Sequence, residues 1–502
     1  MNSSKQIKIG AIISYFAIFV NIASGLIYTP WMMNTIGKSD YGLYTLAMSL
    51  INTFMIDFGL SMATQRYVSK YLADKSQKSV NDVVGLIYKL YFLITCIIFI
   101  VFVVIYFFIG NIYAELTAAE ITKFKSLYIV AVIYSVMSFP FIPLNGILSA
   151  YEKFVQLKIC ELIHKFLAVG LTVAALIMGF GVYSLVLVNL ISGIIHVVVR
   201  LIIVKSYTPL KPKFSYRNNS LLKELFSFSV WTSIFTIVQR FLISLSPSIL
   251  GIVSGSADIA VFGYAVSLET YIYTFVTAIN GFFMPKLSRI SANSGKEQSE
   301  KEVLNLMISV GRFILMLFAL IFVGFLSMGQ EFIYLLFGTE YDASYYCTIL
   351  ICAYGVVAYP QQIANTYVMV KNKVKQRAYI SIGMFVLNTA LSFVLGKFMG
   401  AIGVSIAIFI SLSLFTVAMN VLYKKSLGID IITFFKKCHL KLLPAIIVYL
   451  VVSVAISFIP IYGWKGFAIK VVCILIAYAI ALWFFMLNRE EKNFLLRKVK
   501  KT

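Results

Sequence analysis

Long apolar stretches separated by short polar connections repeat along the whole of the 502-residue chain. Each comes close to the roughly 20 residues with which an α-helix crosses the hydrocarbon core of a bilayer. No connection is long enough for a soluble domain, so the pattern predicts an all-α polytopic membrane protein with about 14 transmembrane helices. The expected spans are residues 9–33, 41–62, 84–110, 123–147, 159–180, 182–204, 225–252, 259–284, 304–328, 345–370, 378–399, 402–423, 443–461 and 466–487.

Composition supports a lipid environment and argues against a soluble enzyme. The chain is 60% hydrophobic and 13% charged, whereas soluble domains are about 45–50% apolar and about 25% charged. The six cysteines show no metal-ligand spacing, and the three histidines form no triad. The sequence therefore predicts no metal site, no cofactor and no catalytic residues.

The net charge of +23 is distributed unevenly among the connections. Of the 43 Lys and Arg residues, 33 lie in alternate connections and in the two ends of the chain, and six lie in the opposite connections or their flanks. By the positive-inside rule, both termini are expected in the cytosol. Because the basic residues sit in short runs between apolar stretches, nucleic acid is not an expected partner.

An internal repeat relates the two halves of the chain at an offset of 218 residues. It places Gly37 over Gly255 and Asp40 over Asp258 at the start of the second and eighth spans, and Asn21 over Gln239 in the first and seventh. Six spans separate the aligned pairs, so the halves share one orientation, and a parallel repeat is expected to hold substrate at its interface. The expected division is an N-lobe at 1–205, a cytosolic linker at 206–224, a C-lobe at 225–423, and two further helices with a basic tail at 424–502.

The second span carries a recognisable motif. The run Ile36-Gly-Lys-Ser-Asp-Tyr-Gly-Leu-Tyr44, followed by Asp57-Phe-Gly-Leu60 and Thr64-Gln-Arg-Tyr67, resembles the N-terminal hallmark of polysaccharide-transport flippases. These proteins export O-antigen, capsule and related repeat units and belong to the multidrug/oligosaccharidyl-lipid/polysaccharide exporter superfamily.

The resemblance implies two six-helix lobes around a cavity that opens alternately to the two sides of a bacterial plasma membrane. It also implies a substrate in which an oligosaccharide is linked to undecaprenyl diphosphate, with membrane lipids as neighbours. Proton or sodium ions are candidate coupling ions, and a polysaccharide polymerase is a candidate partner.

Charges inside the spans are the best candidates for a substrate or coupling role, because a charged side chain near mid-membrane costs about 2.5–3.5 kcal/mol on insertion scales. Arg240 is expected to bind the diphosphate, since guanidinium binds phosphate oxygens bidentately, or to form a structural ion pair. Glu269 is expected to neutralise Arg240 or to carry a coupling proton. Asp57 is a second coupling candidate, and Arg312 a candidate for lining the cavity.

Polar uncharged residues complete the candidate set. Gln239 and Asn21 are candidates because the repeat aligns them with each other. Gln361 and Asn365 are candidates because they share one helix face at i, i+4 spacing. Amides bind sugar hydroxyls but also hold membrane helices together, and the sequence leaves both roles open. Candidate kinks are Pro140, Pro143, Pro247 and Pro360.

Three functions other than a flippase are compared with the sequence. A cation-coupled multidrug exporter of the same superfamily is the alternative. Its cationic substrates require acidic groups in the cavity, whereas this chain has both basic and acidic residues within its spans. A membrane glycosyltransferase or polymerase would need a sizeable external loop, and the sequence has none. Gly37-Lys38-Ser39 has Met32 where a phosphate-binding loop requires its first glycine, which excludes an ATP-driven pump.

Overall fold

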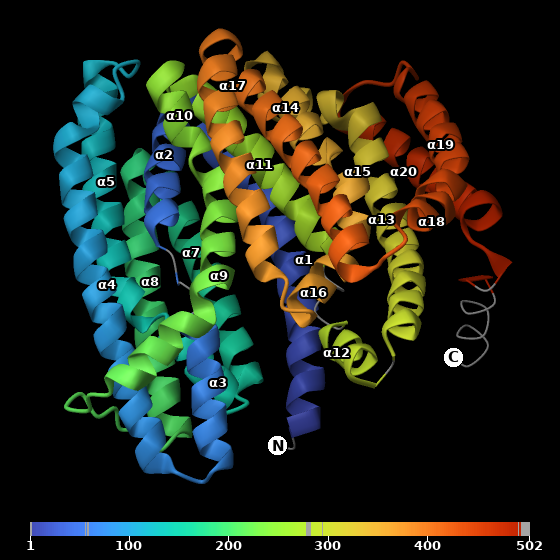
Figure 1. Ribbon diagram of the computed structural model, residues 1–502. Coiled ribbons are helices and arrows are strands. Elements are labelled where there is room, and N and C mark those ends of the chain that lie inside the picture. The colour runs from blue at the N-terminus through green and yellow to red at the C-terminus, as the bar shows by residue number, and fades with distance from the viewer. Residues whose placement is uncertain are drawn as a thin grey trace. The chain divides into compact units, whose positions relative to one another are not determined.

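The computed structural model describes residues 3–55, 57, 60–277, 283–293, 295–489 and 491–492, and these residues form helices with no strand among them (Figure 1). They fall into two compact units. The first is Met1–Gly263 with Gly396–Gly400, and the second is Tyr264–Leu395 with Ala401–Thr502. The end of the eighth expected span and the basic tail beyond Lys492 lie outside the described residues. The lobe boundaries expected from the sequence stay a prediction.

In its described residues the first unit comprises ten α-helices, one 3-10 turn, the start of α11 and the segment Gly396–Gly400 of α17. The α4 and α5 helices pack side by side (Figure 1). Its elements are α1 (Ser3–Ile36), α2 (Lys38–Phe54), α3 (Leu60–Ala73), α4 (Gln77–Ile112), α5 (Ala118–Ser138), η1 (Phe139–Phe141), α6 (Pro143–Ala150), α7 (Phe154–Ile177), α8 (Gly181–Tyr207), α9 (Asn219–Ser244), α10 (Ser246–Val253) and α11 (Ser256–Thr277).

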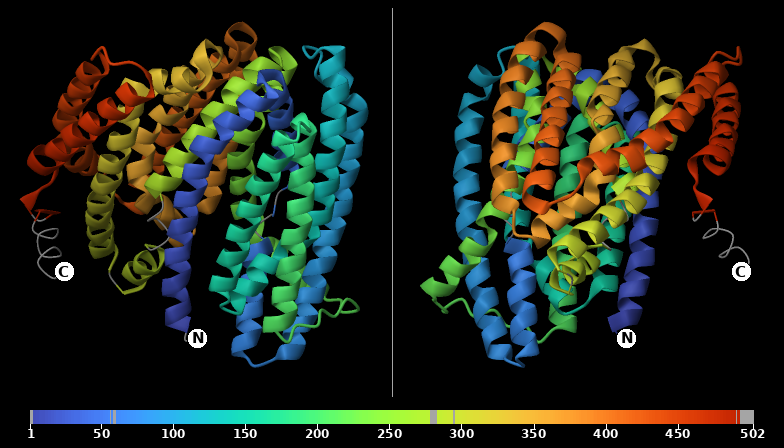
Figure 2. Two further views of the ribbon diagram at one scale, coloured as in Figure 1. Left: turned by 180° about the vertical axis from the view of Figure 1, so that it is seen from behind. Right: turned by 45° about the vertical axis from the view of Figure 1, so that its right-hand side comes forward.

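The second unit continues from α11 and ends with a helical hairpin. The α19 and α20 helices, red in both views of Figure 2, lie side by side. Its further elements are α12 (Met284–Asn293), α13 (Lys296–Phe337), η3 (Gly338–Tyr341), α14 (Asp342–Ala353), α15 (Gly355–Ala358), η4 (Tyr359–Gln361), α16 (Gln362–Val370), α17 (Val374–Leu427), α18 (Ile431–Phe435), η5 (Lys436–Leu440), α19 (Lys441–Ser457), α20 (Gly463–Ala481) and η6 (Leu482–Met486).

The expected all-α polytopic fold is confirmed. Nine helical segments in the described chain are long and apolar enough to cross a membrane. Two of them, Lys296–Val370 and α17, are long enough for two crossings each, and α17 is broken at Gly400. The remaining expected spans, the first, second and seventh, coincide with α1, with α2 and the start of α3, and with α9–α10.

The internal repeat appears in local backbone geometry. Gly37 and Gly255 both have a positive φ, 85° and 114°, and each directly precedes a helix whose first turn carries the matching aspartate. Further on, at an offset of 220 residues, Glu152 and Asn372 both adopt φ near 55° in identical helix-ending turns. The same turn also ends α3 at Lys75, so the pairs at Gly37 and Gly255 and at Glu152 and Asn372 agree with the repeat locally.

Proline residues interrupt helices in both units. Pro140 lies in η1, and Pro143 begins α6 directly after it. Pro247 lies in the first turn of α10, and Pro360 in η4. Proline has no N–H to donate to the preceding turn, so the helix breaks there. At these four candidate kinks an α-helix is interrupted or begins anew, whereas Pro30 in α1 and Pro444 in α19 lie inside continuous helices.

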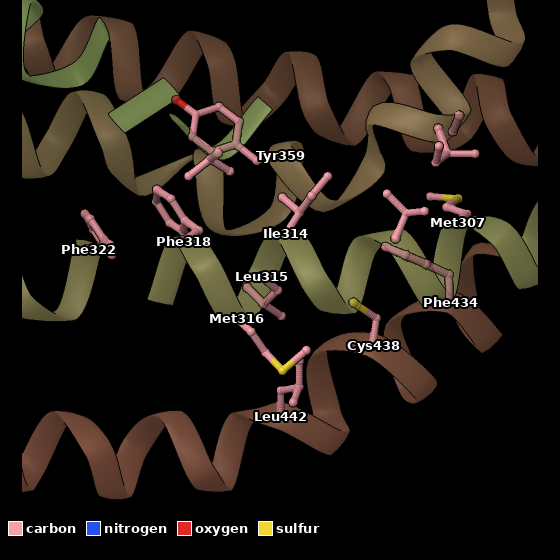
Figure 3. Close-up of a cluster of buried hydrophobic side chains, with 14 of the residues drawn as sticks. Met307, Ile314, Leu315, Met316, Phe318, Phe322, Tyr359, Phe434, Cys438 and Leu442 are labelled. Carbon is pink, nitrogen blue, oxygen red and sulfur yellow. The ribbon is translucent and has the colours of Figure 1, made fainter. Parts of the chain in front are cut away.

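The second unit has an extensive apolar core along α13. Met307, Ile314 and Phe318 are buried there, and Phe434 and Leu442 pack against them from α18 and α19. Figure 3 shows these side chains, together with the Tyr359 ring, which meets the Phe318 ring edge-on at 5.2 Å between centroids. The core fixes Tyr359, whose hydroxyl enters the polar cluster described below.

Close helix approach in the first unit makes Gly42 sensitive to substitution. A Cβ at this position of α2 would lie 2.0 Å from the carbonyl oxygen of Ser256. Because that neighbour is backbone, Gly42→Ala is expected to destabilise the protein by about 1–3 kcal/mol through overpacking. The measurement is the thermal unfolding midpoint of the detergent-solubilised protein.

Gly170→Ala in α7 is the matched control, since a Cβ there meets nothing within 4 Å. Replacing an unobstructed helical glycine by alanine is expected to be stabilising by roughly 0.5–1 kcal/mol. Equal effects of the two substitutions would contradict the close approach of α2 to Ser256.

Candidate functional site: a polar cavity at the break between α2 and α3

The first unit contains a cavity of about 420 Å³ beside the interruption between α2 and α3. Its walls come from α2, α3, α5, α6, α8 and α9, so residues far apart in the sequence meet there. The lining residues are Met48, Ile51, Asn52, Met55, Asp57, Ser61, Tyr134, Ile142, Asn145, Asn189 and Arg240. Two of them, Asp57 and Arg240, are charged.

The helix break explains where these charges lie. The second expected span is not one continuous helix: α2 ends at Phe54 and α3 begins at Leu60. Helix termini leave backbone groups without intrahelical partners. Arg240 Nη1 on α9 donates to the Met55 carbonyl at 2.9 Å, and the Ser61 amide donates to Asp57 Oδ2 at 3.2 Å.

Asp57 is held by a second donor from another helix. The hydroxyl of Tyr91 on α4 donates to Asp57 Oδ1, and Tyr91 itself is fully buried. The ion pairs among the described residues do not include one between Asp57 and Arg240. Opposite charges therefore line one cavity, each anchored by uncharged groups.

Three asparagine side chains supply amides to the cavity. Asn189 on α8 donates from Nδ2 to the Tyr44 hydroxyl at 2.9 Å. The buried Oδ1 atom of Asn145 has no hydrogen-bond partner among the described residues. With Asn52 on α2, these groups offer both donors and acceptors to a ligand. Sequence reasoning missed all three, although each is a lone amide within an apolar span.

Glu269 lies in a different setting, in the second unit. It is 5% exposed, and its Oε1 accepts a hydrogen bond from the Tyr359 hydroxyl at 2.9 Å. The rings of Tyr273 and Tyr354 pack against Tyr359, with centroids 5.5 and 5.6 Å away. The buried carboxylate is thus bound by a tyrosine whose ring packs against two other tyrosines, and its suggested neutralisation of Arg240 stays a prediction.

Arg312 is the centre of a third polar cluster. Its Nε and Nη2 atoms donate to the two carboxylate oxygens of Glu491 at 2.9 and 3.1 Å. Sequence reasoning missed this acidic partner because it follows the last span, 179 residues away. Lys470 on α20, assigned from the sequence to an external flank, is also buried and forms an ion pair with Glu331 on α13 at 3.0 Å.

The remaining candidates lie on several elements. Gln361 is buried in η4, and its Nε2 has no partner among the described residues; Asn365 on α16 accepts from the Tyr423 hydroxyl at 2.8 Å. The expected i, i+4 face thus begins in a 3-10 turn. Asn21 on α1 and Gln239 on α9 are half-buried and do not line the cavity of the first unit.

Comparison with protein families matches residues 35–345 to a model described as polysaccharide biosynthesis protein. This region includes the motif in the second span and all of the residues that line the cavity. A comparison with curated protein sequences finds no significant match.

Solved structures share the fold at low sequence identity. A lipid II flippase, MurJ, in an inward closed conformation matches with a TM-score of 0.73 and 15% identity, covering 94% of this chain and 97% of its own. An inward-facing multidrug resistance transporter of the MATE family matches with a TM-score of 0.66 and 13% identity, covering 85% and 100%. A transporter from Pyrococcus furiosus, of the same MOP superfamily, matches with a TM-score of 0.53 and 13% identity, covering 85% and 96%.

The buried Glu269–Tyr359 pair yields a test of stability. Tyr359→Phe removes the hydroxyl donor while leaving the buried carboxyl group in place. The expected loss is about 1–3 kcal/mol of unfolding free energy, the desolvation penalty of an unsatisfied buried group. Denaturant or thermal unfolding in detergent measures it, with Tyr462→Phe at a site 83% exposed as the control.

A double variant separates pairing from general packing effects. Tyr359→Phe combined with Glu269→Met removes both polar partners, and its cost is expected to be smaller than the sum of the two single costs. Strictly additive costs would show that the hydrogen bond does not couple the two side chains.

Proposed function

The chain belongs to the polysaccharide biosynthesis protein family, and we propose that it is a flippase for an oligosaccharide repeat unit linked to undecaprenyl diphosphate. It would move this substrate from the cytosolic to the outer leaflet of a bacterial plasma membrane by alternating access of two lobes. The observation that supports the proposal best is the cavity of the first unit, where a guanidinium group, a carboxylate and three amides line one space.

The guanidinium of Arg240 matches the diphosphate of such a substrate. One of its five N–H donors is used at the Met55 carbonyl, and the side chain is exposed. Planar guanidinium groups bind phosphate oxygens through two parallel hydrogen bonds, which favours arginine over lysine for this role. Since Arg240 is anchored to backbone at the helix break, its charge is held at the cavity before substrate arrives.

The amides match the sugars. Sugar hydroxyls both donate and accept hydrogen bonds, and an amide side chain offers both. Asn52, Asn145 and Asn189 come from three different helices and line the same cavity as Arg240. An oligosaccharide could therefore replace water at these groups while its polyprenyl chain stays in lipid.

The membrane potential favours export of this substrate. Moving one charge across the membrane changes the free energy by about 2.3 kcal/mol per 100 mV. Two negative charges moving outward from an inside-negative cell would therefore gain about 4.6 kcal/mol per 100 mV.

Substitution of Arg240 tests the proposal. In proteoliposomes containing a fluorescent polyprenyl-diphosphate oligosaccharide, Arg240→Ala is expected to slow translocation about ten- to hundredfold, since hydrogen bonds to charged groups contribute about 1.5–3 kcal/mol. Arg240→Lys is expected to restore only part of the rate, because ammonium binds phosphate without bidentate geometry.

Arg217→Ala is the control, because Arg217 is an exposed residue of the connection between α8 and α9. All variants are compared at equal reconstituted amounts of protein. Full translocation by Arg240→Ala would refute the role of the cavity. Loss of translocation in the Arg240 variants alone, while every variant stays incorporated in the lipid membrane, would support it.

Asp57 and Glu269 are the proposed coupling groups. With Asp57 ionised the two charges of the cavity cancel, whereas a proton on Asp57 leaves a net positive charge that favours a diphosphate. Asp57→Asn is therefore expected to bind the substrate more tightly and to make transport insensitive to an imposed pH gradient.

Glu269→Gln is tested in parallel under pH and sodium gradients. If coupling involves only Glu269, transport by Asp57→Asn will still depend on the imposed gradient, whereas transport by Glu269→Gln will not. Gradient dependence that survives both substitutions would refute coupling through either group.

A cation-coupled multidrug exporter is the second candidate, and the acidic Asp57 in the cavity favours it. Organic cations would need the carboxylate and would be repelled by Arg240. Under this alternative, Arg240→Ala would increase export of an organic cation such as ethidium and Asp57→Asn would abolish it. The flippase proposal expects neither change.

A further inference from the structure

The second unit contains another polar cavity, of about 750 Å³, independent of the transport site proposed above. It lies between α13, the π-helical turn η5, the start of α19 and the segment that follows η6. Arg312, Lys437, Lys441 and Arg489 line it, with Glu491 as the single carboxylate among its lining residues. The charge pattern of the sequence assigns this end of the unit to the cytosolic side.

Arg312 is fixed at the base of this cavity. It is 5% exposed, and besides Glu491 its Nη2 atom donates to the Met486 carbonyl at 2.7 Å. That carbonyl belongs to the last turn of η6, where backbone acceptors have no partner within the helix. The guanidinium therefore joins the end of one helical segment to the carboxylate and presents a fixed positive charge.

Glu491 is aimed into the cavity by its own short segment. Its Oε2 accepts from the Asn488 amide at 2.8 Å, and the Asn488 side chain accepts from the Glu491 amide at 2.8 Å. Burial alone raises the pKa of Glu491, but the hydrogen bonds from Arg312 and the Asn488 amide and the charges of Arg312 and Lys441 outweigh it. The pKa consequently lies below its usual value, and the group stays ionised at neutral pH.

Among the described residues that line this cavity, four are cationic and one is a carboxylate. The side chains of Lys437, Lys441 and Arg489 are exposed, so they can reach a ligand that enters from solvent or from the membrane surface. A phosphate group carries more charge than a carboxylate and has more acceptor oxygens, and guanidinium accommodates it with the same bidentate geometry. The cavity is therefore better matched to a phosphate than to its present occupant.

We propose that this cavity is a binding site for a phosphate group, occupied internally by Glu491 until a phosphate-bearing ligand displaces it. The neighbouring surface favours the headgroup of an anionic lipid as that ligand. Phe485 lines the cavity and is 67% exposed, its neighbour Phe484 is equally exposed, and α19 and α20 expose many further apolar side chains. Aromatic residues beside basic ones are typical of the membrane–water interface, where basic groups attract anionic headgroups.

The test uses the full-length protein in nanodiscs that contain equal amounts of phosphatidylglycerol and phosphatidylcholine. Native mass spectrometry measures how much of each lipid stays bound. The cavity variant is Lys437→Ala/Lys441→Ala, and the matched control is Lys424→Ala/Lys425→Ala, which removes the same charge at the end of α17. We expect at least a tenfold loss of retained phosphatidylglycerol in the cavity variant and little change in the control.

Glu491→Gln tests displacement separately from charge. Removing the competing negative charge is expected to increase phosphatidylglycerol retention several-fold. A parallel titration of detergent-solubilised protein with inorganic pyrophosphate, followed by calorimetry, distinguishes a free phosphate ligand from a lipid headgroup.

Pyrophosphate binding that the cavity variant loses, without selective lipid retention, would support the phosphate site and assign it to a soluble ligand. Equal losses in the two double-lysine variants would overturn the proposal, since general surface charge would then explain binding. The absence of both selective lipid retention and pyrophosphate binding would also overturn it. Unfolding midpoints of all variants, measured beside the binding experiments, identify any variant that has lost its fold.

Discussion

Charged and polar groups inside hydrocarbon need a partner, and this requirement governs the arrangement of the polar side chains in this protein. Two buried or half-buried carboxylates, Asp57 and Glu269, each accept a hydrogen bond from a tyrosine on another element. Arg312 and Lys470 instead form ion pairs with acidic residues from distant parts of the chain. Arg240 differs from these cations, because its guanidinium donates to a backbone carbonyl at a helix break. A cation anchored to backbone is not bound directly by a carboxylate, so its remaining N–H donors face the cavity that it shares with Asp57.

Helix breaks create the places where such groups gather. The interruption between α2 and α3 releases backbone groups that Arg240 and Ser61 engage, and the cavity forms beside it. The 3-10 turn at Pro360 likewise directs Tyr359 toward Glu269. Irregular backbone at membrane depth is tolerated where it is buried in protein or lines a polar cavity, so each break and its polar cluster support one another.

Much of the fold was predictable because the bilayer imposes a length on every apolar helix. The positions of the spans, the proline breaks and the local repeat at Gly37 and Gly255 follow from patterns within short stretches of sequence. The break after Phe54 was not foreseen, because residues 41–62 form one apolar run with no proline or long polar segment in it. Asp57 and Gly59 are poor helix formers in that run, and the contacts made there by Tyr91 on α4 and Arg240 on α9 come from distant parts of the chain.

The sequence by itself determined the helical, membrane-spanning class of this protein, its repeated plan and the few charges that lie within apolar spans. Those properties follow from the hydrophobicity of each residue and from the length of each apolar run, both of which can be read directly from the sequence. Only the tertiary structure decided which partner each charged group binds. Asp57 accepts a hydrogen bond from Tyr91, Arg240 donates to the Met55 carbonyl, and Arg312 pairs with Glu491, 179 residues away. Which side chains pair depends on the spatial distance between residues on different helices. That distance does not follow from the spacing of the residues along the chain.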